Sequence, residues 1–238
     1  VIVQSSTGRI FMLADAQPSE CGYLQCKTGT GYCEVDGKKH LLLTKGNNGD
    51  KLDSFEYYVG EFNGDFAPIF TRNGNKITEY SLDREFRLYK NGEPLYAEQK
   101  GSENVKVQQK IFYSAAEFKC YKTTYLWLRY SDDNGKTWSY PQIISDQVKK
   151  EKESFLGVGP GRSVVINHNG KERILFCVYD NNGLFKDPIF ENASAVYSDD
   201  NGATWHRSNK IKIKKGIGKT SEAQLVKIKG ENYKALRM

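Results

Sequence analysis

Long apolar runs, histidines and closely paired cysteines are scarce in this 238-residue chain. No apolar run approaches the roughly 20 residues that a transmembrane helix needs, so the sequence predicts no membrane span. The first residues, VIVQSSTGRIF, lack the basic start and apolar stretch of a signal peptide. Three histidines and the absence of a CxxC pair argue against a zinc site. We therefore expect no metal and no other cofactor.

The five cysteines do not by themselves predict a disulfide framework. Three of them fall within the stretch CGYLQCKTGTGYC, and an odd total neither requires nor excludes a disulfide. We interpret them as buried or free thiols. They occupy Cys21, Cys26, Cys33, Cys120 and Cys177.

The charge balance is mildly basic, with a formal net charge of +6. The lysine-rich residues 209–219 alternate apolar and basic side chains, which favours a half-exposed strand over a nucleic-acid patch. No nucleic-acid module is recognisable, so we expect no nucleic-acid partner. The excess charge is weak support for a small anionic ligand.

Short strand signals separated by Gly, Asn and Asp turns dominate the chain. Only residues 145–157 resemble a helix, and their periodicity is poor. Many short strands at regular spacing predict an all-β sandwich, barrel or propeller. The expected strands are RIFML, HLLLT, FEYYVGEF, FRLYK, QKIFYS, TYLWLRYS, SVVIN, RILFCVYD, SAVYSDD and AQLVKIK.

One phrase occurs twice, as YSDDNGKTW at residues 130–138 and YSDDNGATW at residues 197–205. Asn-Gly between strand residues is a strong turn signal, because both residues tolerate a positive φ. The aspartate can accept hydrogen bonds from the turn, and the tryptophan can cover the core. The alternative is a calcium loop, but the distal glutamate is missing and the flanks are strands. We interpret the phrase as a structural turn.

The repeated pattern SxDxGxTW resembles the Asp-box of sialidases. The segments FLGVGPGRSVVI, RILFCVYDNN and TSEAQLV resemble, in the same order, segments of the large bacterial exo-α-sialidases with Asp-box repeats. This resemblance implies part of a six-bladed β-propeller with a small inserted β-rich domain. The expected division is residues 1–16 and 119–238 in the propeller, and residues 17–118 in the insertion.

The resemblance also implies the chemistry of a retaining glycoside hydrolase that removes terminal sialic acid from sialylated glycans. Such enzymes use a tyrosine nucleophile activated by a glutamate, an acid aspartate, and three arginines that hold the substrate carboxylate. Glu222 of TSEAQ stands at the position of that glutamate, and Arg237 at the position of one arginine. Tyr179 resembles a tyrosine of the substrate pocket. We interpret residues 157–161, GVGPG, as a tight loop near that pocket and Arg162 as rim charge.

The acid aspartate and one arginine are expected before Val1, and the nucleophilic tyrosine and the third arginine after Met238. From this departure we expect the 238-residue chain alone to be inactive, with the remaining propeller blades missing from it. The resemblance places the parent protein outside the cell, either secreted or at the cell surface. Two alternatives remain: an intramolecular trans-sialidase, which shares the catalytic residues, and a non-catalytic Asp-box propeller that binds a glycan or a protein.

Overall fold

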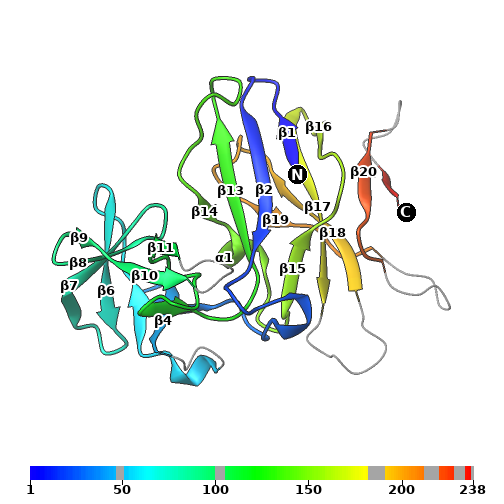
Figure 1. Ribbon diagram of the computed structural model, residues 1–238. Coiled ribbons are helices and arrows are strands. Elements are labelled where there is room, and N and C mark those ends of the chain that lie inside the picture. Colours follow the sequence, from blue (N-terminus) through cyan, green and yellow to red (C-terminus); the bar gives the residue numbers. More distant parts are fainter. Residues whose placement is uncertain (47–50, 100–104, 182–190, 212–219, 228–233, 237–238) are drawn as a thin grey trace. The chain divides into compact units, whose positions relative to one another are not determined.

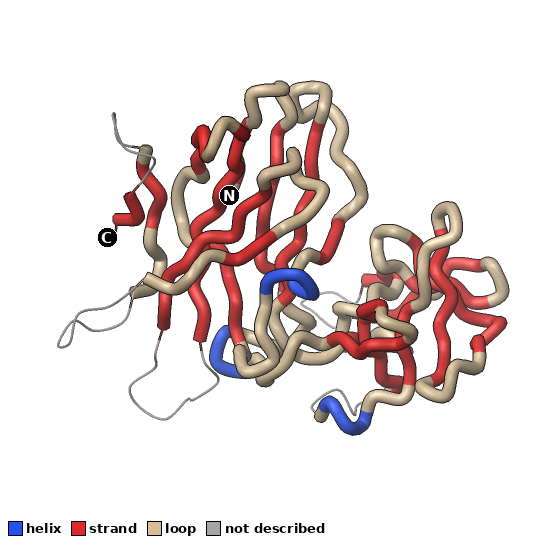
Figure 2. Tube along the Cα trace, turned by 180° about the vertical axis from the view of Figure 1, so that it is seen from behind, coloured by secondary structure: helices blue, strands red, loops and turns tan. Residues whose placement is uncertain are grey.

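A computed structural model describes residues 1–46, 51–99, 105–181, 191–211, 220–227 and 234–236. Almost all of its regular structure is strand, which confirms the all-β prediction (Figures 1 and 2). The chain divides into two compact units. The first contains Val1–Ala16 and Thr124–Met238, and the second contains Gln17–Thr123.

The first unit contains the strands that are expected to form propeller blades. Its elements are β1 (Ile2–Gln4), β2 (Ile10–Ala16), β13 (Tyr125–Ser131), β14 (Gln142–Ile143), α1 (Ser145–Val148), β15 (Phe155–Val158), β16 (Val164–His168), β17 (Lys171–Asn181), β18 (Glu191–Ser198), β19 (His206–Arg207), β20 (Gln224–Val226) and β21 (Lys234–Leu236).

These strands form two antiparallel sheets and a terminal hairpin, which Figure 1 shows. The first sheet is four-stranded with the order β1-β2-β13-β14. The second is five-stranded with the order β15-β17-β18-β19, and β16 pairs with the other half of β17. β20 pairs with β21 in the hairpin. Sequential antiparallel strands in separate sheets are the arrangement of propeller blades.

A single buried cluster takes its side chains from both sheets. Within it Trp205 packs against two aromatic rings, with its ring centre 6.1 Å from that of Phe11 and 5.5 Å from that of Phe176. Burying side chains of this size contributes on the order of 2 kcal/mol each. The cluster contains Val3, Phe11, Leu13, Leu126, Leu128, Ile144, Val148, Leu156, Ile174, Phe176, Val178, Val196 and Trp205. Its packing holds the two sheets together.

Both repeated phrases fold as turns with the same hydrogen bonds. In the first, the Gly135 amide donates to Ser131 Oγ at 2.8 Å, and Ser131 Oγ donates to Asp133 Oδ1 at 2.8 Å. Thr137 donates to Asp133 from both its amide and its hydroxyl. Asn134 and Gly135 have φ of 60° and 83°. The second turn repeats the pattern around Asp200, so the turn interpretation is confirmed.

The duplication extends beyond the repeated phrase to an arginine on the neighbouring strand. Arg9 forms two hydrogen bonds with Asp132 and lies 4.2 Å from the centre of the Tyr130 ring. In the second sheet, Arg173 forms two hydrogen bonds with Asp199 and stacks in the same way on a tyrosine, Tyr197. Each arginine precedes the residue that pairs with the serine of its turn. The repeated unit therefore includes an arginine that contacts the residues on either side of the serine of the turn.

The second unit is built on one eight-stranded antiparallel sheet. Its order is β12-β4-β5-β6-β7-β8-β9, with β3 paired to β4. A separate hairpin pairs β10 with β11. The elements are β3 (Tyr32–Val35), β4 (Lys38–Lys45), β5 (Tyr57–Val59), β6 (Phe66–Thr71), β7 (Lys76–Asp83), β8 (Leu88–Lys90), β9 (Glu93–Pro94), β10 (Tyr96–Gln99), β11 (Val105–Gln108), β12 (Phe118–Cys120) and the 3₁₀ turns η1 (Tyr23–Gln25) and η2 (Leu52–Ser54). Because β12 pairs with β4, this unit extends past residue 118 to Thr123.

Three local expectations from the sequence differ from the structure. The helix-like residues 145–157 form only the short helix α1, and β15 begins at Phe155. QKIFYS is not a strand: it forms turns after β11, where the Tyr113 amide donates to the carbonyl of Lys110. Of the basic residues 209–219, the structure describes only 209–211, which lie outside any strand, and the remainder lies outside the described residues.

Candidate active site

Side chains with possible catalytic roles gather at the strand ends opposite the repeated turns. In the second sheet, Ser198 of the turn pairs with Ile174, whereas Tyr179 pairs with Ala193. About five residues of extended strand separate these two levels, which corresponds to roughly 16 Å. In the first sheet, Ser131 of the turn and Asp15 likewise lie at opposite ends of the paired strands β13 and β2. The repeated turns therefore lie far from the candidate site.

Tyr179 is a half-buried residue near the end of β17. It pairs with Gly157 of β15, and its ring centre lies 5.2 Å from that of Phe155. Burial raises the pKa of Tyr179 to about 12, and the negative charges of Asp15, Glu222 and Glu191 contribute to this shift. The phenol thus stays protonated near neutral pH and can donate a hydrogen bond.

Two of the carboxylates that act on Tyr179 were not identified from the sequence. Asp15, on β2, accepts a hydrogen bond from the Val158 amide at 3.3 Å. Glu191, the first residue of β18, is 7% exposed. Asp15 could have been identified by its position at the end of an apolar strand, but its approach to Tyr179 depends on pairing between distant segments. Both residues add hydrogen-bond acceptors at the strand ends where Tyr179 lies.

Glu222 is an exposed residue whose backbone has a φ of 48°. The segment before it is held by Thr220, which donates its amide to the carbonyl of Glu191 and accepts from the Ala193 amide, both at 3.0 Å. A left-handed conformation costs a non-glycine residue about 1 to 2 kcal/mol. Strain of this kind concentrates at functional sites. Glu222 lies at the same strand ends as Tyr179, whose pKa its negative charge helps to raise.

The GVGPG loop packs directly against the TSEAQ segment. A Cβ on Gly159 would lie 2.5 Å from the carbonyl oxygen of Ala223. A Cβ on Gly161, where φ is +99°, would lie 2.6 Å from the side-chain amide of Gln224. The backbone oxygen facing Gly159 and the positive φ of Gly161 both favour glycine. The loop is therefore adjacent to Glu222, and the Arg162 that follows it is exposed.

Arg237 lies outside the described residues, so its side chain is not placed. The hairpin that leads to it is described in part, with Gln224 paired to Leu236. The expected position of Arg237 as one of the substrate-binding arginines therefore stays a prediction.

A buried group of charged residues, which was not expected from the sequence, includes Asp180, the residue that follows Tyr179 on β17. Asp180 and Glu153 have fully buried side chains, and Arg207 bridges them with contacts of 2.5 and 2.7 Å. Lys210 approaches Asp180 at 2.6 Å. Buried carboxylates require such partners. The group joins the residue after Tyr179 to the segment before β15 and to β19.

Neither a metal-binding cluster nor a membrane span is found in the described part of the chain. No group of three or more His, Cys, Asp or Glu side chains there could hold a metal ion. No described helix is long and apolar enough to cross a membrane. The candidate site at these strand ends instead contains carboxylates and a phenol, which can accept and donate protons and bind hydroxyl groups.

Comparisons with known proteins identify sialidases as relatives. The BNR/Asp-box repeat matches residues 129–140 and 196–207. The chain is 32% identical over 237 residues to the anhydrosialidase of Macrobdella decora, covering 93% of this chain and 29% of that protein. It is 26% identical to sialidase B of Streptococcus pneumoniae serotype 4, covering 96% of this chain and 31% of that protein.

Solved structures show the same relationship. The intramolecular trans-sialidase of Ruminococcus gnavus, in complex with oseltamivir carboxylate, superimposes with a TM-score of 0.76 and 35% identity, covering 96% of this chain and 46% of that one. The leech intramolecular trans-sialidase complexed with 2,7-anhydro-Neu5Ac gives a TM-score of 0.76 and 30% identity, covering 96% and 33%. The chain thus spans less than half the length of each of these relatives.

The resemblance seen in the sequence is confirmed. The chain carries two BNR/Asp-box repeats, its homologues are sialidases, and its structural neighbours are sialidase β-propellers.

Proposed function

We propose that this chain, a homologue of the sialidases, provides part of the active site of an exo-α-sialidase. The observation that carries the proposal is the convergence of Glu222, Tyr179 and Asp15 at one strand edge, beside the GVGPG loop. The repeated turns, which are the most conspicuous motif of the sequence, lie at the other end of the strands. Sialidase relatives along nearly the whole chain support this assignment.

In this proposal Glu222 acts as the general base for the tyrosine nucleophile of the complete enzyme. Sialic acid carries a carboxylate on the reacting carbon, so a neutral phenol approaches it with less repulsion than a carboxylate nucleophile would. Glu222 is exposed at the edge and can therefore reach a phenol supplied by a segment outside the described residues. Arg237 would bind the substrate carboxylate with its planar guanidinium group.

Tyr179 and Asp15 would bind the hydroxyl-rich part of the sugar. The phenol of Tyr179 stays protonated well above neutral pH and donates a hydrogen bond. Asp15 has one carboxylate oxygen on the Val158 amide, and a second oxygen can accept from a sugar hydroxyl. Neither residue suits the sialic acid carboxylate, because the carboxylates of Asp15, Glu191 and Glu222 would repel it. The substrate carboxylate would therefore be held by Arg237 rather than by Tyr179 or Asp15.

An intramolecular trans-sialidase is the second candidate, and the relatives favour it specifically. The two solved structures compared above, at 35% and 30% identity, are both intramolecular trans-sialidases. Mass spectrometry of the sugar that the parent protein releases from a sialyllactose separates the two reactions. Hydrolysis gives free sialic acid, whereas internal transfer gives an anhydro sugar that is lighter by one water.

A non-catalytic propeller that binds a glycan or a protein is the alternative from a different class. Incubation of the parent protein with a fluorogenic sialoside decides between the classes. Release of the fluorophore supports the enzyme, and sialoside binding without release, at several pH values, contradicts it. Arg237→Ala should weaken sialic acid binding in the parent protein, and unchanged binding would remove the proposed role of Arg237.

We also propose that the 238-residue chain alone has no turnover, because the resemblance places the acid aspartate, the nucleophilic tyrosine and two arginines outside it. Cleavage of the fluorogenic sialoside by this chain, lost on Glu222→Gln, would contradict that statement. A location outside the cell stays a prediction, which detection of the parent protein in the culture medium or on intact cells would test.

A further inference from the structure

Two thiols in the second unit lie within contact of each other. The sulfur atoms of Cys21 and Cys26 are 3.4 Å apart, and the two residues are only 4% and 2% exposed. A disulfide has a sulfur-sulfur distance of about 2.05 Å. The sulfurs must therefore approach by about 1.4 Å for the bond to form.

The backbone brings these two thiols together through a closed local turn. The Cys21 amide donates to the carbonyl of Pro18 at 3.0 Å, and the Cys26 amide donates to the carbonyl of Gly22 at 3.2 Å. Between them the chain makes the single 3₁₀ turn η1. A Cβ on Gly22 would meet only the flexible end of the Gln25 side chain, at 2.6 Å, so the turn is closed by these backbone hydrogen bonds rather than by a requirement for glycine. The proximity of the thiols is thus built into the turn.

Burial disfavours the reactive thiolate form at other cysteines of the chain as well. Burial raises the pKa of Cys177 to about 11, and burial also raises the pKa of Cys33. Because the thiolate is the reacting form, a raised pKa slows thiol–disulfide exchange near neutral pH. These two cysteines therefore provide internal controls for a reaction confined to Cys21 and Cys26.

We propose that Cys21 and Cys26 are a modification site at which an intrachain disulfide forms. The oxidant is a small-molecule disulfide such as oxidised glutathione. One cysteine thiolate attacks it and releases one reduced glutathione, and the second cysteine thiolate then displaces the other. One protein S–S bond forms, the S–S bond of glutathione breaks, and the two thiol protons end on the two reduced glutathione molecules. The two cysteines are oxidised and the glutathione disulfide is reduced.

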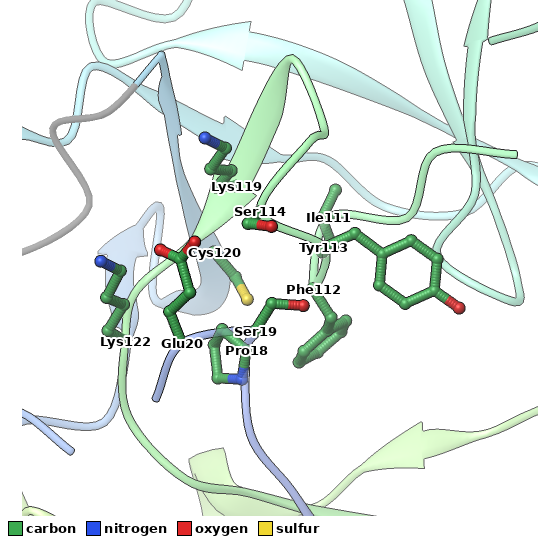
Figure 3. Close-up of a pocket in the computed structure, with 10 residues that line it drawn as sticks. All are labelled: Pro18, Ser19, Glu20, Ile111, Phe112, Tyr113, Ser114, Lys119, Cys120 and Lys122. Carbon is green, nitrogen blue, oxygen red and sulfur yellow. The ribbon is translucent and has the colours of Figure 1, made fainter. Parts of the chain in front are cut away.

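The cross-link would fix one wall of a pocket within the second unit. Figure 3 shows Pro18, Ser19 and Glu20, the residues that lead into Cys21, along this pocket. Its volume is about 230 Å³, and Lys119 and Cys120 are also among its lining residues. Glu20 has a φ of 65°, so this wall already adopts a costly backbone conformation. A disulfide at Cys21, the next residue, would reduce the number of backbone conformations that this wall can adopt.

Peptide mapping of the full chain tests the proposal without any substitution. Cleavage after lysine and arginine places both cysteines in the peptide of residues 10–27, which contains no other cysteine, and leaves Cys33, Cys120 and Cys177 in separate peptides. The native chain is equilibrated with oxidised and reduced glutathione, denatured, alkylated and digested. We expect residues 10–27 without alkyl groups and lighter by two hydrogens, and the other three cysteines alkylated.

Several outcomes of the mapping would overturn the proposal. They are two alkyl groups on residues 10–27, a glutathione adduct on one of its cysteines, or a bridge from this peptide to another. The thermal unfolding midpoint, Tm, provides a second test. Oxidation should raise Tm by about 5 °C, an effect that Cys26→Ser should remove and Cys33→Ser should leave intact. An equal Tm shift in Cys26→Ser would contradict a Cys21–Cys26 bond.

Discussion

Gly159 and Ala223 approach so closely that a Cβ on Gly159 would lie 2.5 Å from the carbonyl oxygen of Ala223. Ala223 follows Glu222 directly, and Gly159 also donates its amide to the carbonyl of Cys177 at 2.8 Å. The two glycines of GVGPG that face TSEAQ thus set where the candidate glutamate stands. This contact connects two segments that lie far apart in the sequence.

Gly159→Ala should displace the TSEAQ segment. The new methyl group meets a backbone oxygen that cannot rotate away, so overpacking of about 1 to 3 kcal/mol is expected. Gly170→Ala is the matched control, because no atom lies within 4 Å of its Cβ and only its φ of +81° is unfavourable. The urea midpoint of each variant and the turnover of the parent protein are measured. An effect on turnover no larger for Gly159→Ala than for Gly170→Ala would contradict the contact.

The proximity of Glu222 and Tyr179 can be tested without any activity. Glu222→Gln should lower the pKa of Tyr179 from about 12, because it removes one of the negative charges that raise it. Asp15→Asn should do the same. Nuclear magnetic resonance of tyrosine labelled at Cζ, with Tyr179→Phe to assign the signal, follows the titration. Glu151→Gln, at an exposed turn position, is the control and should leave the pKa unchanged. An unchanged pKa of Tyr179 in the Glu222→Gln variant would show that the two side chains do not lie close together.

The two repeated tryptophans should differ strongly in their contribution to stability. Trp205 is 2% exposed and packs between Phe11 and Phe176, whereas Trp138 is half-buried. Trp205→Ala should therefore cost about 3 to 5 kcal/mol of unfolding free energy, and Trp138→Ala distinctly less. Urea denaturation followed by circular dichroism measures both. Equal costs would show that the cluster between the sheets does not depend on Trp205.

Acid should weaken the first repeated turn. Hydrogen bonds from Thr137 and Ser131 lower the pKa of Asp133 from 3.8 to about 2. A lowered folded-state pKa means that the stabilisation is complete above pH 3.8 and is lost as the pH falls toward 2. Asp133→Asn should therefore show a smaller loss of stability over this range than the unchanged chain. Asp36→Asn, at an exposed position in the second unit, is the control and should behave like the unchanged chain.

Local patterns predicted the fold well, and long-range contacts account for what they missed. Asn134 and Gly135 specify their turn through their own backbone preferences, so the repeated phrase was interpretable from sequence alone. QKIFYS has strand-forming residues but folds as turns, because tertiary packing decides the state of such short apolar segments.

The candidate site likewise combines residues that local motifs mark with residues that only long-range contacts bring together. Glu222 and Tyr179 could be proposed from a family resemblance that lies in local motifs. Asp15 could not, because its role depends on β2 lying beside β15, at positions far apart in the chain. The ion pairs of Arg207 with Glu153 and Asp180 likewise join three separate segments, and no local pattern marks them.

The most direct test of the central claim is the turnover number of the parent protein carrying Glu222→Gln. Glutamine keeps the size and polarity of the side chain but cannot accept a proton. We expect a kcat at least about 100-fold lower, with an unchanged Tm. Glu151→Gln should retain full activity. A Glu222→Gln protein that turns over a fluorogenic sialoside at the unchanged rate would contradict the assignment of this edge as the active site.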